Sequence, residues 1–303
     1  MRNWVPILVF FATAALAGFS PASAPVLAPA RQQPSEAEAQ LRADKLTANQ
    51  HRNDSAVEQY ERIEHQIDRT GGPNPRVTED RTFRVVPTGT GTMKILLRDN
   101  DKTPGPTDYH KQLEQWREAL ELALKPDDSR AKSAFAKFDK KRKDRAELID
   151  AMRDGFTHKW LGQETIDGHS CDVYQLDPNP NFHPKTLLQE VISHVVAKIW
   201  VDREQNQLVR GQANVTKDIS VGGGILGKLY RGGVFFFQQS EVAPGIWFPY
   251  LYQYDFTARR FLFTFEEHQV IQSSRFRRVG TPKEALAIVQ SELASGKTLT
   301  ADP

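Results

Sequence analysis

The chain has 303 residues, of which 39% are hydrophobic and 26% are charged, as in an ordinary globular protein. Its 40 Lys and Arg nearly balance its 38 Asp and Glu, which leaves a formal net charge of +2. Binding to nucleic-acid phosphates requires a clustered positive surplus, so this balance argues against nucleic acid as a main partner.

The first 24 residues predict a secretory signal peptide. Arg2 precedes the apolar run WVPILVFFATAALAGF, and a small-x-small cleavage site follows at Ala22-Ser23-Ala24. A second site at Ala28-Pro29-Ala30 would place the cut as late as residue 30. A retained membrane anchor is the alternative, but the run is shorter than the roughly 20 residues that span a bilayer. We therefore expect an exported protein, with a linker at 25–34 that is rich in Pro, Ala and Ser.

A helix and three strands are expected next. Ser35 and Glu38 have the spacing of a capping box, which predicts a helix over EAEAQLRADKLTANQ, residues 36–50. Three short runs at 57–67, 76–86 and 92–98 are separated by Gly and Pro turns, as in an antiparallel meander. The first run also has the spacing of a helical stripe, so helix is an alternative there.

The segment 107–153 has helical periodicity and predicts a helical insertion. Leu113, Trp116 and Leu120 recur at intervals of three and four residues, and Pro126 ends this first helix. The second helix has a strongly basic face. Such a face is either simply solvated or a docking surface for anionic lipid head groups or an acidic partner. The candidate docking residues are Lys140, Lys141, Arg142, Lys143 and Arg145.

Strand patterns dominate from residue 155 onward. Runs such as HSCDVYQL, VVAKIWVD and QLVRGQANV are joined by short turns, among them Asp167-Gly168 and Pro244-Gly245. A final helix is expected near 283–293. The pattern predicts an α+β fold with an antiparallel sheet of about seven to ten strands, which must curl or split to cover its apolar face.

Motifs for catalysis or cofactors are weak. The run GGGILGKL at 222–229 imitates a phosphate-binding loop, but Leu229 stands where Ser or Thr would hold magnesium, and no helix is expected to follow. No two His have the spacing of a helical zinc site, and no G-x-S-x-G turn occurs. Cys171 alternates with apolar residues on an expected strand, which favours a buried, inert thiol. We expect no cofactor and no metal.

Aromatic side chains gather between residues 230 and 276, which hold 14 of them. With a period of two, IWFPYLYQYDF places alternate aromatics on one strand face. Monomers rarely expose apolar patches above roughly 300 to 600 Å², so helices or a ligand must cover this face. The Tyr residues favour a lined cavity, because a buried phenol needs a hydrogen-bond partner, and a filled core is the alternative. The candidate lining residues are Phe248, Tyr250, Tyr252, Tyr254, Phe256, Phe261, Phe263, Phe265, Phe235 and Phe237.

Residues 35–280 resemble the LolA/LolB-type outer-membrane lipoprotein-sorting family. The strand KIWVD hairpinned to QLVRGQANV, the later pair VFFFQQSEVAPGIWFP, the N-terminal helix and the helical insertion carry this resemblance. It implies one domain, in which the curled antiparallel sheet forms a half-open β-barrel that is covered by helices and carries the insertion 107–153, followed by a C-terminal helix and tail at 281–303. Members of this family shelter acyl chains, or bind a partner, in an incomplete barrel closed by helices.

These patterns together favour a non-enzymatic periplasmic carrier or binding protein for a hydrophobic ligand, such as a lipid or the acyl chains of a lipoprotein. The alternative is an envelope module for protein interaction or sensing, with a filled core and a role for the membrane surface or an envelope protein. A periplasmic hydrolase, with an active site assembled from distant residues, is the third hypothesis.

Overall fold

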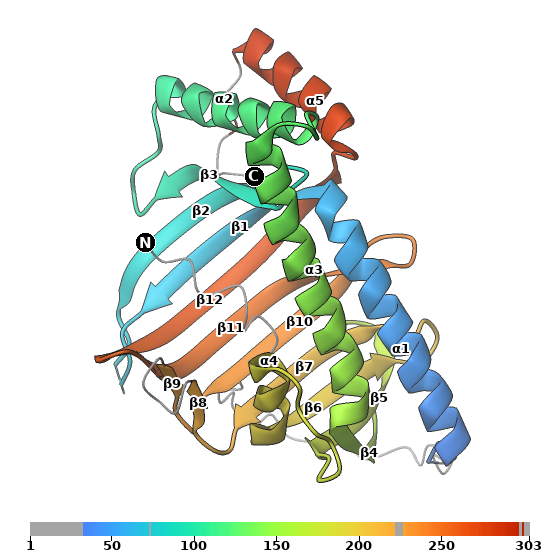
Figure 1. The fold of residues 1–303 in the computed structure, drawn as a ribbon. Helices are drawn as coiled ribbons and strands as arrows, with labels where there is room; N and C mark the ends of the chain where they lie inside the picture. The colour runs from blue at the N-terminus through green and yellow to red at the C-terminus, as the bar shows by residue number, and fades with distance from the viewer. Residues whose placement is uncertain (1–32, 73, 222–226, 297–298, 300–303) are drawn as a thin grey trace. The chain divides into compact units, whose positions relative to one another are not determined.

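The computed structural model describes residues 33–72, 74–221, 227–296 and 299, and the predicted signal peptide lies outside these ranges. The helices are α1 (Glu36–Ala56), α2 (Pro106–Ala123), α3 (Ser129–Gly155), α4 (Leu187–Glu190) and α5 (Pro282–Ser295), with 3-10 turns at Val57–Gln59 and Val191–His194 (Figure 1). The strands are β1 (Tyr60–Arg69), β2 (Val77–Pro87), β3 (Thr92–Asp99), β4 (Phe156–Ile166), β5 (His169–Pro178), β6 (Val195–Asp202), β7 (Leu208–Val215), β8 (Ile219–Val221), β9 (Gly227–Leu229), β10 (Val234–Ala243), β11 (Ile246–Arg260) and β12 (Phe263–Arg278).

The described strands pair in the order β3-β2-β1-β12-β11-β10-β7-β6-β5-β4, and the short β9 pairs with β11 and β8. The pairs are antiparallel, and β3 and β4 form two separate ends of this order. The predicted α+β class, with an unclosed antiparallel sheet accompanied by helices, is therefore confirmed.

Most predicted elements are confirmed, with shifted ends. The 57–67 run is a strand rather than a helix, apart from its first turn. Helix α1 begins at its predicted cap, where Glu38 N donates to Ser35 Oγ at 3.3 Å and Ser35 N donates to Glu38 Oε2 at 2.8 Å. The aromatic stripe expected through Phe265 is divided, because β11 ends at Arg260, the chain reverses at Phe261 and Leu262, and β12 starts at Phe263.

The chain divides into two compact units, which we describe separately. Unit 1 contains the described parts of Met1–Gln50, Leu148–Ser240 and Tyr252–His268. Unit 2 contains the described parts of His51–Glu147, Glu241–Leu251 and Gln269–Pro303.

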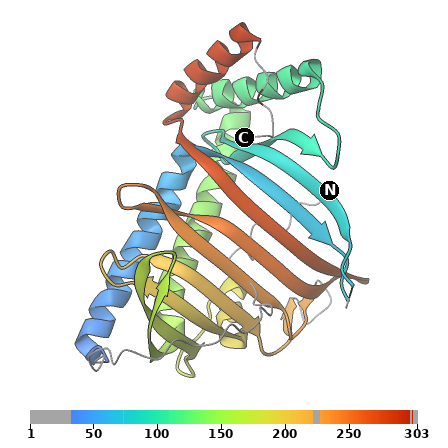
Figure 2. The same ribbon diagram turned by 180° about the vertical axis from the view of Figure 1, so that it is seen from behind.

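Unit 2 is built on β1, β2 and β3, with α2 and α5 lying side by side (Figures 1 and 2). The apolar stripe predicted on α2 is buried here: Leu113, Trp116 and Leu120 pack with Ile95 of β3 and Val289 of α5. Burying large apolar side chains in this way supplies the main stabilisation of a helix against a sheet.

A buried charge network lies within unit 2. Arg84 of β2 donates to Glu61 of β1 through Nε and Nη2, at 2.9 and 2.6 Å, and to Glu292 of α5 through Nη1 at 2.6 Å. Arg277 donates to the other oxygen of Glu61 at 2.6 Å. The Arg84 guanidinium also lies 5.0 Å from the ring centre of Trp116. Because each buried charge has an opposite partner, the network ties α5 to the strands of unit 2.

Unit 1 holds the beginning of α1, the end of α3, and β4 to β7 with β10. The predicted turn between β4 and β5 is present, with positive φ at Asp167 (50°) and Gly168 (85°), which suits the Asp-Gly pair. Near the end of α3, Ala151 packs in one apolar cluster with Phe156 of β4 and Ile192 of the second 3-10 turn. This arrangement places α1 and α3 over one face of the unit 1 strands, where the candidate site lies.

Candidate functional site

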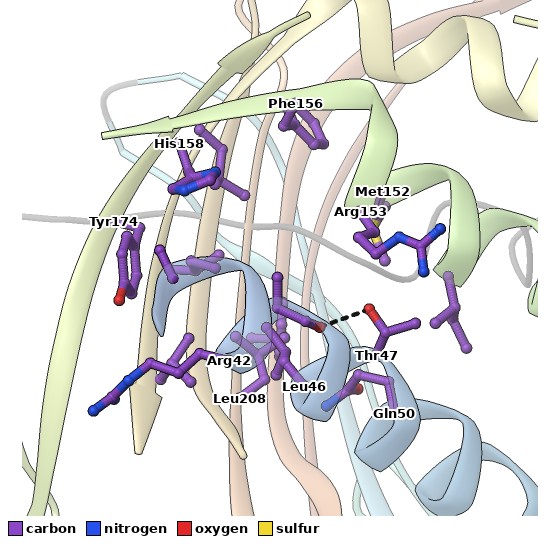
Figure 3. Close-up of a pocket in the computed structure, with 17 residues that line it drawn as sticks. Arg42, Leu46, Thr47, Gln50, Met152, Arg153, Phe156, His158, Tyr174 and Leu208 are labelled. Atoms are coloured by element: carbon purple, nitrogen blue, oxygen red, sulfur yellow. Dashed lines mark hydrogen bonds between the residues drawn. The ribbon is translucent and has the colours of Figure 1, made fainter. Parts of the chain in front are cut away.

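A pocket of about 130 Å³ lies within unit 1 (Figure 3). Helix α1 supplies one wall and the end of α3 a second, while β4, β5, β6, β7 and β10 supply the floor. The apolar lining consists of Ala39, Ala43, Leu46, Ile149, Met152, Phe156, Leu176, Ile199, Val201, Leu208 and Phe237. The polar or amphipathic lining consists of Arg42, Thr47, Gln50, Arg153, His158 and Tyr174.

The local structure explains which side chains reach the pocket. On α1 the lining positions 39, 43, 46 and 50 are separated by three or four residues, so they share one helix face. On the strands the lining positions alternate, as at 156 and 158, 174 and 176, and 199 and 201. Side chains two residues apart share a sheet face, so the strands present one continuous surface to α1.

Two polar atoms in this lining have no hydrogen-bond partner among the described residues. They are Nε2 of Gln50 and Oη of Tyr174, and both residues are more than nine-tenths buried. Gln50 uses its other amide atom, Oε1, to accept from Gln239 at 3.5 Å. Burial raises the pKa of Tyr174, and the charge of Asp172 adds to this effect, so the phenol stays protonated and able to donate. Each of these two atoms exposes less than 1 Å² of surface, so a ligand in the pocket would reach these donors only after neighbouring side chains move.

Ion pairs hold α1 beside the pocket. Arg42 donates to Asp172 of β5 at 2.7 Å, and Trp160 donates to the other oxygen of Asp172 at 3.2 Å. Arg153 of α3 lies 3.6 Å from Asp44 of α1. In Figure 3 the guanidinium groups of Arg42 and Arg153 lie on opposite sides of the lining residues. Basic groups therefore flank the pocket, and Arg42 is tied to a buried carboxylate.

Of the ten predicted lining residues, Phe237 lines this pocket. Several others of unit 1 form an aromatic cluster next to it. Phe237 lies 6.4 Å from Tyr252, and Phe235 stacks on Phe256 at 5.5 Å. Tyr254 and Phe265 complete this cluster, at 6.4 Å from Phe235 and 6.5 Å from Phe256.

The remaining predicted aromatics lie elsewhere. Phe248 is buried in unit 2, with ring centres 5.0 Å from Tyr60 and 5.5 Å from Phe276, and Tyr250 is half-buried in the same unit. Phe261 and Phe263 are exposed at the β11–β12 turn. The expected stripe thus divides because the chain reverses at residues 261 and 262, which returns the last phenylalanines along a second strand.

Sequence reasoning missed most of the pocket wall that α1 supplies. The signal was weak, because two of the four positions are Ala and one is Gln, and small side chains give little amphipathic pattern. Strand alternation was a stronger signal: Phe235 and Phe237 were expected on the face opposite Phe236, and both are buried while Phe236 is half-buried.

The predicted docking residues on α3 are of two kinds: the arginines pair with acids outside α3, and the lysines are exposed. Arg145 pairs with Asp54 at 2.8 Å and with Glu58 at 3.3 Å, and Arg142 lies 3.2 Å from Glu58. Lys140 and Lys143 are each 75% exposed and pair along the helix with Asp144 and Glu147. Lys141 is also exposed. The three lysines therefore face solvent, whereas the two arginines partly brace unit 2.

Three other features that bear on function are the thiol of Cys171, metal-binding clusters and membrane-spanning helices, considered for the described part of the chain. Cys171 is buried, and burial raises the pKa of its thiol to about 12, which agrees with the expected inert thiol. Within the described ranges no group of three or more His, Cys, Asp or Glu has the geometry to hold a metal ion. Among the described helices, none combines the length and apolar character needed to cross a membrane.

No family model matches the chain, and no curated protein matches its sequence. Fifteen chains of solved structures match it, among them the following three. A domain from Vibrio parahaemolyticus assigned to outer membrane lipoprotein sorting has 9% identity and a TM-score of 0.33, and the match covers 78% of this chain and 92% of that domain. A DUF1329 family protein from Desulfovibrio piger has 13% identity and a TM-score of 0.30, with 78% and 92% covered.

The third structure is a LolA superfamily protein from Nitrosomonas europaea, with 10% identity and a TM-score of 0.25, covering 78% of this chain and 96% of that one. Two of these three structures are named for lipoprotein sorting or for the LolA superfamily. All three scores are low, so the functional argument below depends on the pocket of unit 1 and not on these likenesses.

Proposed function

We propose that this protein is an exported periplasmic carrier or binding protein for a hydrophobic ligand, such as a lipid or a lipoprotein acyl chain, and that it acts without a catalytic step. The pocket of unit 1 is the observation that carries the proposal. Its lining is mostly apolar, with a few polar groups, which is the composition of small-molecule sites in proteins.

The pocket volume limits what is bound. At about 130 Å³ it is close to the roughly 150 Å³ apolar cavity that accepts benzene, and below the range of about 300 to 1,000 Å³ usual for larger ligands. The end of an acyl chain fits such a space. A longer chain requires α1 to move away from the strands. The aromatic cluster around Phe235 and Tyr254 would then extend the apolar surface from Phe237.

The two unpartnered donors indicate the polar part of the ligand. A buried donor without an acceptor costs about 1 to 3 kcal/mol, and an acceptor in the ligand removes this cost. Gln50 Nε2 and Tyr174 Oη therefore favour a ligand with a carboxylate or ester oxygen over a pure hydrocarbon.

The test begins with mass spectrometry of lipids extracted from gently purified protein, followed by titration with a fluorescent fatty acid. We expect a bound amphiphile and saturable uptake of the probe. Gln50→Leu and Tyr174→Phe should each weaken binding of the fatty acid roughly fivefold or more, but leave binding of a matched alkyl probe without oxygen nearly unchanged. Protein that carries no lipid and takes up neither probe would exclude the carrier function.

A protein-interaction module remains the second candidate, and the exposed lysines of α3 favour it. Replacement of Lys140, Lys141 and Lys143 by Ala should then abolish pull-down of an acidic envelope partner. Lys111, Lys125 and Lys132 are a control set, since they are exposed cations of the helical segment outside the predicted surface. Equal capture by both triple variants would count against this candidate.

A further inference from the structure

The turn between β11 and β12 exposes an apolar cluster that the pocket does not explain. Strand β11 ends at Arg260 and β12 begins at Phe263, so Phe261 and Leu262 form the turn. We call Phe261, Leu262, Phe263 and Phe265 the hairpin tip. Their exposed fractions are 52%, 91%, 78% and 43%. Scattered exposed apolar residues are ordinary, but four within five positions at one chain reversal are a contiguous patch.

The residues of this turn go against local backbone preference. Phe261 has φ of 52°, a region that Gly, Asn and Asp adopt readily and that a bulky side chain rarely adopts. Another hairpin of unit 1 places Asp167-Gly168 at its turn, in agreement with that preference. Neither local conformation nor burial therefore favours Phe-Leu at residues 261 and 262. Residues that oppose local backbone preference and add nothing to folding stability indicate a functional position.

The tip stands on a rigid base within unit 1. Phe265 contacts Phe256 edge to face at 6.5 Å, and Phe256 stacks on the buried Phe235 at 5.5 Å. Next to the turn, β9 pairs with β11 and places Lys228 opposite Arg259 (Figure 1). The exposed side chains are therefore presented by paired strands.

Basic residues precede the tip, and Glu266 and Glu267 follow Phe265 directly. Arg259 and Arg260 precede Phe261 directly, and the segment 258–265 contains no Asp or Glu. Lys228 adds a third cation beside Arg259, although it pairs with Asp218 at 2.7 Å. The nearest following acid, Glu266, lies 3.3 Å from His268. Exposed aromatic and aliphatic side chains with Arg at their base are the composition of segments that bind at a lipid interface.

We propose that the hairpin tip inserts into the surface of a lipid bilayer that contains anionic phospholipids. Phe261, Leu262 and Phe263 would enter the boundary between head groups and acyl chains, while Arg259 and Arg260 contact lipid phosphates. A protein partner is less suitable, because four side chains at a hairpin end cannot supply the roughly 800 Å² per partner of a stable interface. A bilayer needs no such complementary surface.

The first experiment is flotation with vesicles of phosphatidylglycerol and phosphatidylcholine, and with phosphatidylcholine alone. It uses the exported protein, with its N-terminus read by mass spectrometry, because the apolar run at residues 4–19 would itself bind vesicles. We expect binding to the anionic vesicles that weakens as salt is raised. The double variant Leu262→Ser with Phe263→Ser should bind about tenfold more weakly or worse. The control, Leu41→Ser with Leu161→Ser, replaces exposed residues of α1 and β4 and should bind normally.

The second experiment tests where insertion occurs. Cys171 is buried with a raised thiol pKa, so Phe263→Cys would introduce the reactive thiol needed for a polarity-sensitive dye. Its emission should shift to the blue when anionic vesicles are added. A dye at Leu161→Cys should not shift. Arg260→Gln should reduce binding to anionic vesicles about fivefold, and binding to neutral vesicles much less.

Three results would overturn the proposal: no flotation of the unaltered protein, equal flotation of the tip and control variants, or no change at the dye on residue 263. Sedimentation of the protein without vesicles tests the alternative, in which the tip binds a second copy of the chain. If the tip variants abolish a concentration-dependent dimer and leave flotation unchanged, the tip binds a second copy of the chain and not a bilayer.

Discussion

The ring of Phe237 on β10 occupies the space that a side chain at Gly211 on β7 would need. The two residues pair directly in the antiparallel register, and a Cβ placed on Gly211 would overlap Cε1 and Cζ of the Phe237 ring. Because Phe237 lines the pocket, the absence of a side chain at residue 211 helps to determine the depth of the pocket floor.

Gly211→Ala should therefore destabilise the protein and reduce the pocket. The new methyl group must push the Phe237 ring toward α1, and overpacking of this kind costs about 1 to 3 kcal/mol. Urea denaturation would measure the stability change. Adding Phe237→Leu to Gly211→Ala should give a loss smaller than the sum of the two single losses, since the smaller side chain relieves the overlap. Strict additivity would show that the two residues do not compete for this space.

Ala43→Phe tests whether the pocket binds the ligand. Ala43 lies on the α1 wall, so a phenyl ring there should fill much of the cavity and lower the affinity for a fluorescent fatty acid at least tenfold. Ala48 lies on the same helix and is exposed, so Ala48→Phe is the matched control and should bind as well as the unaltered protein. Equal affinity of the two variants would place the binding site elsewhere in the molecule.

Turn chemistry explains why the strands were predictable. Asp167-Gly168 and Pro244-Gly245 combine residues that suit positive φ or a tight turn, and both separate two strands as expected. The reversal at Phe261-Leu262 was missed for the same reason. Two large apolar residues carry no turn signal, so the aromatic pattern reads as one uninterrupted stripe.

The pocket was harder to predict than the strands. Apart from Leu46, its α1 wall consists of small or polar residues whose only common property is their spacing along a helix. Which side chains meet in space depends on the pairing of β4 to β7 and β10, and such long-range order cannot be read from local periodicity. Phe237 was identified because it shares one face of an aromatic strand with Phe235, whereas Tyr174 and Gln50 gave no comparable signal.

Arg84→Met should strongly destabilise the protein. Arg84 is buried and pairs with Glu61 and Glu292, so its removal leaves carboxylates with fewer cationic partners in a poorly hydrated site. Breaking such a buried pair costs about 3 to 5 kcal/mol. Arg117→Met removes a more exposed arginine that pairs with Glu114 and Glu121 along α2, and should cost less than about 1 kcal/mol. Similar urea midpoints for the two variants would show that the network contributes little.

Acidification should release part of the stability that this network provides. Burial alone would raise the pKa of Glu292, but the hydrogen bond from Arg84 and the charges of Arg84 and Arg277 outweigh it, so the folded-state pKa lies below the ordinary value of 4.5. A lowered carboxyl pKa stabilises the folded state above the unfolded pKa, and this contribution disappears as the pH falls through the folded pKa. Glu292→Gln should therefore cost roughly 1 to 3 kcal/mol at pH 7 and much less at pH 3. Glu118→Gln, at an exposed site on α2, should leave the pH dependence of the parent unchanged. Thermal denaturation from pH 7 to 3 would measure both variants, and a Glu292→Gln curve parallel to that of the parent would contradict the assignment.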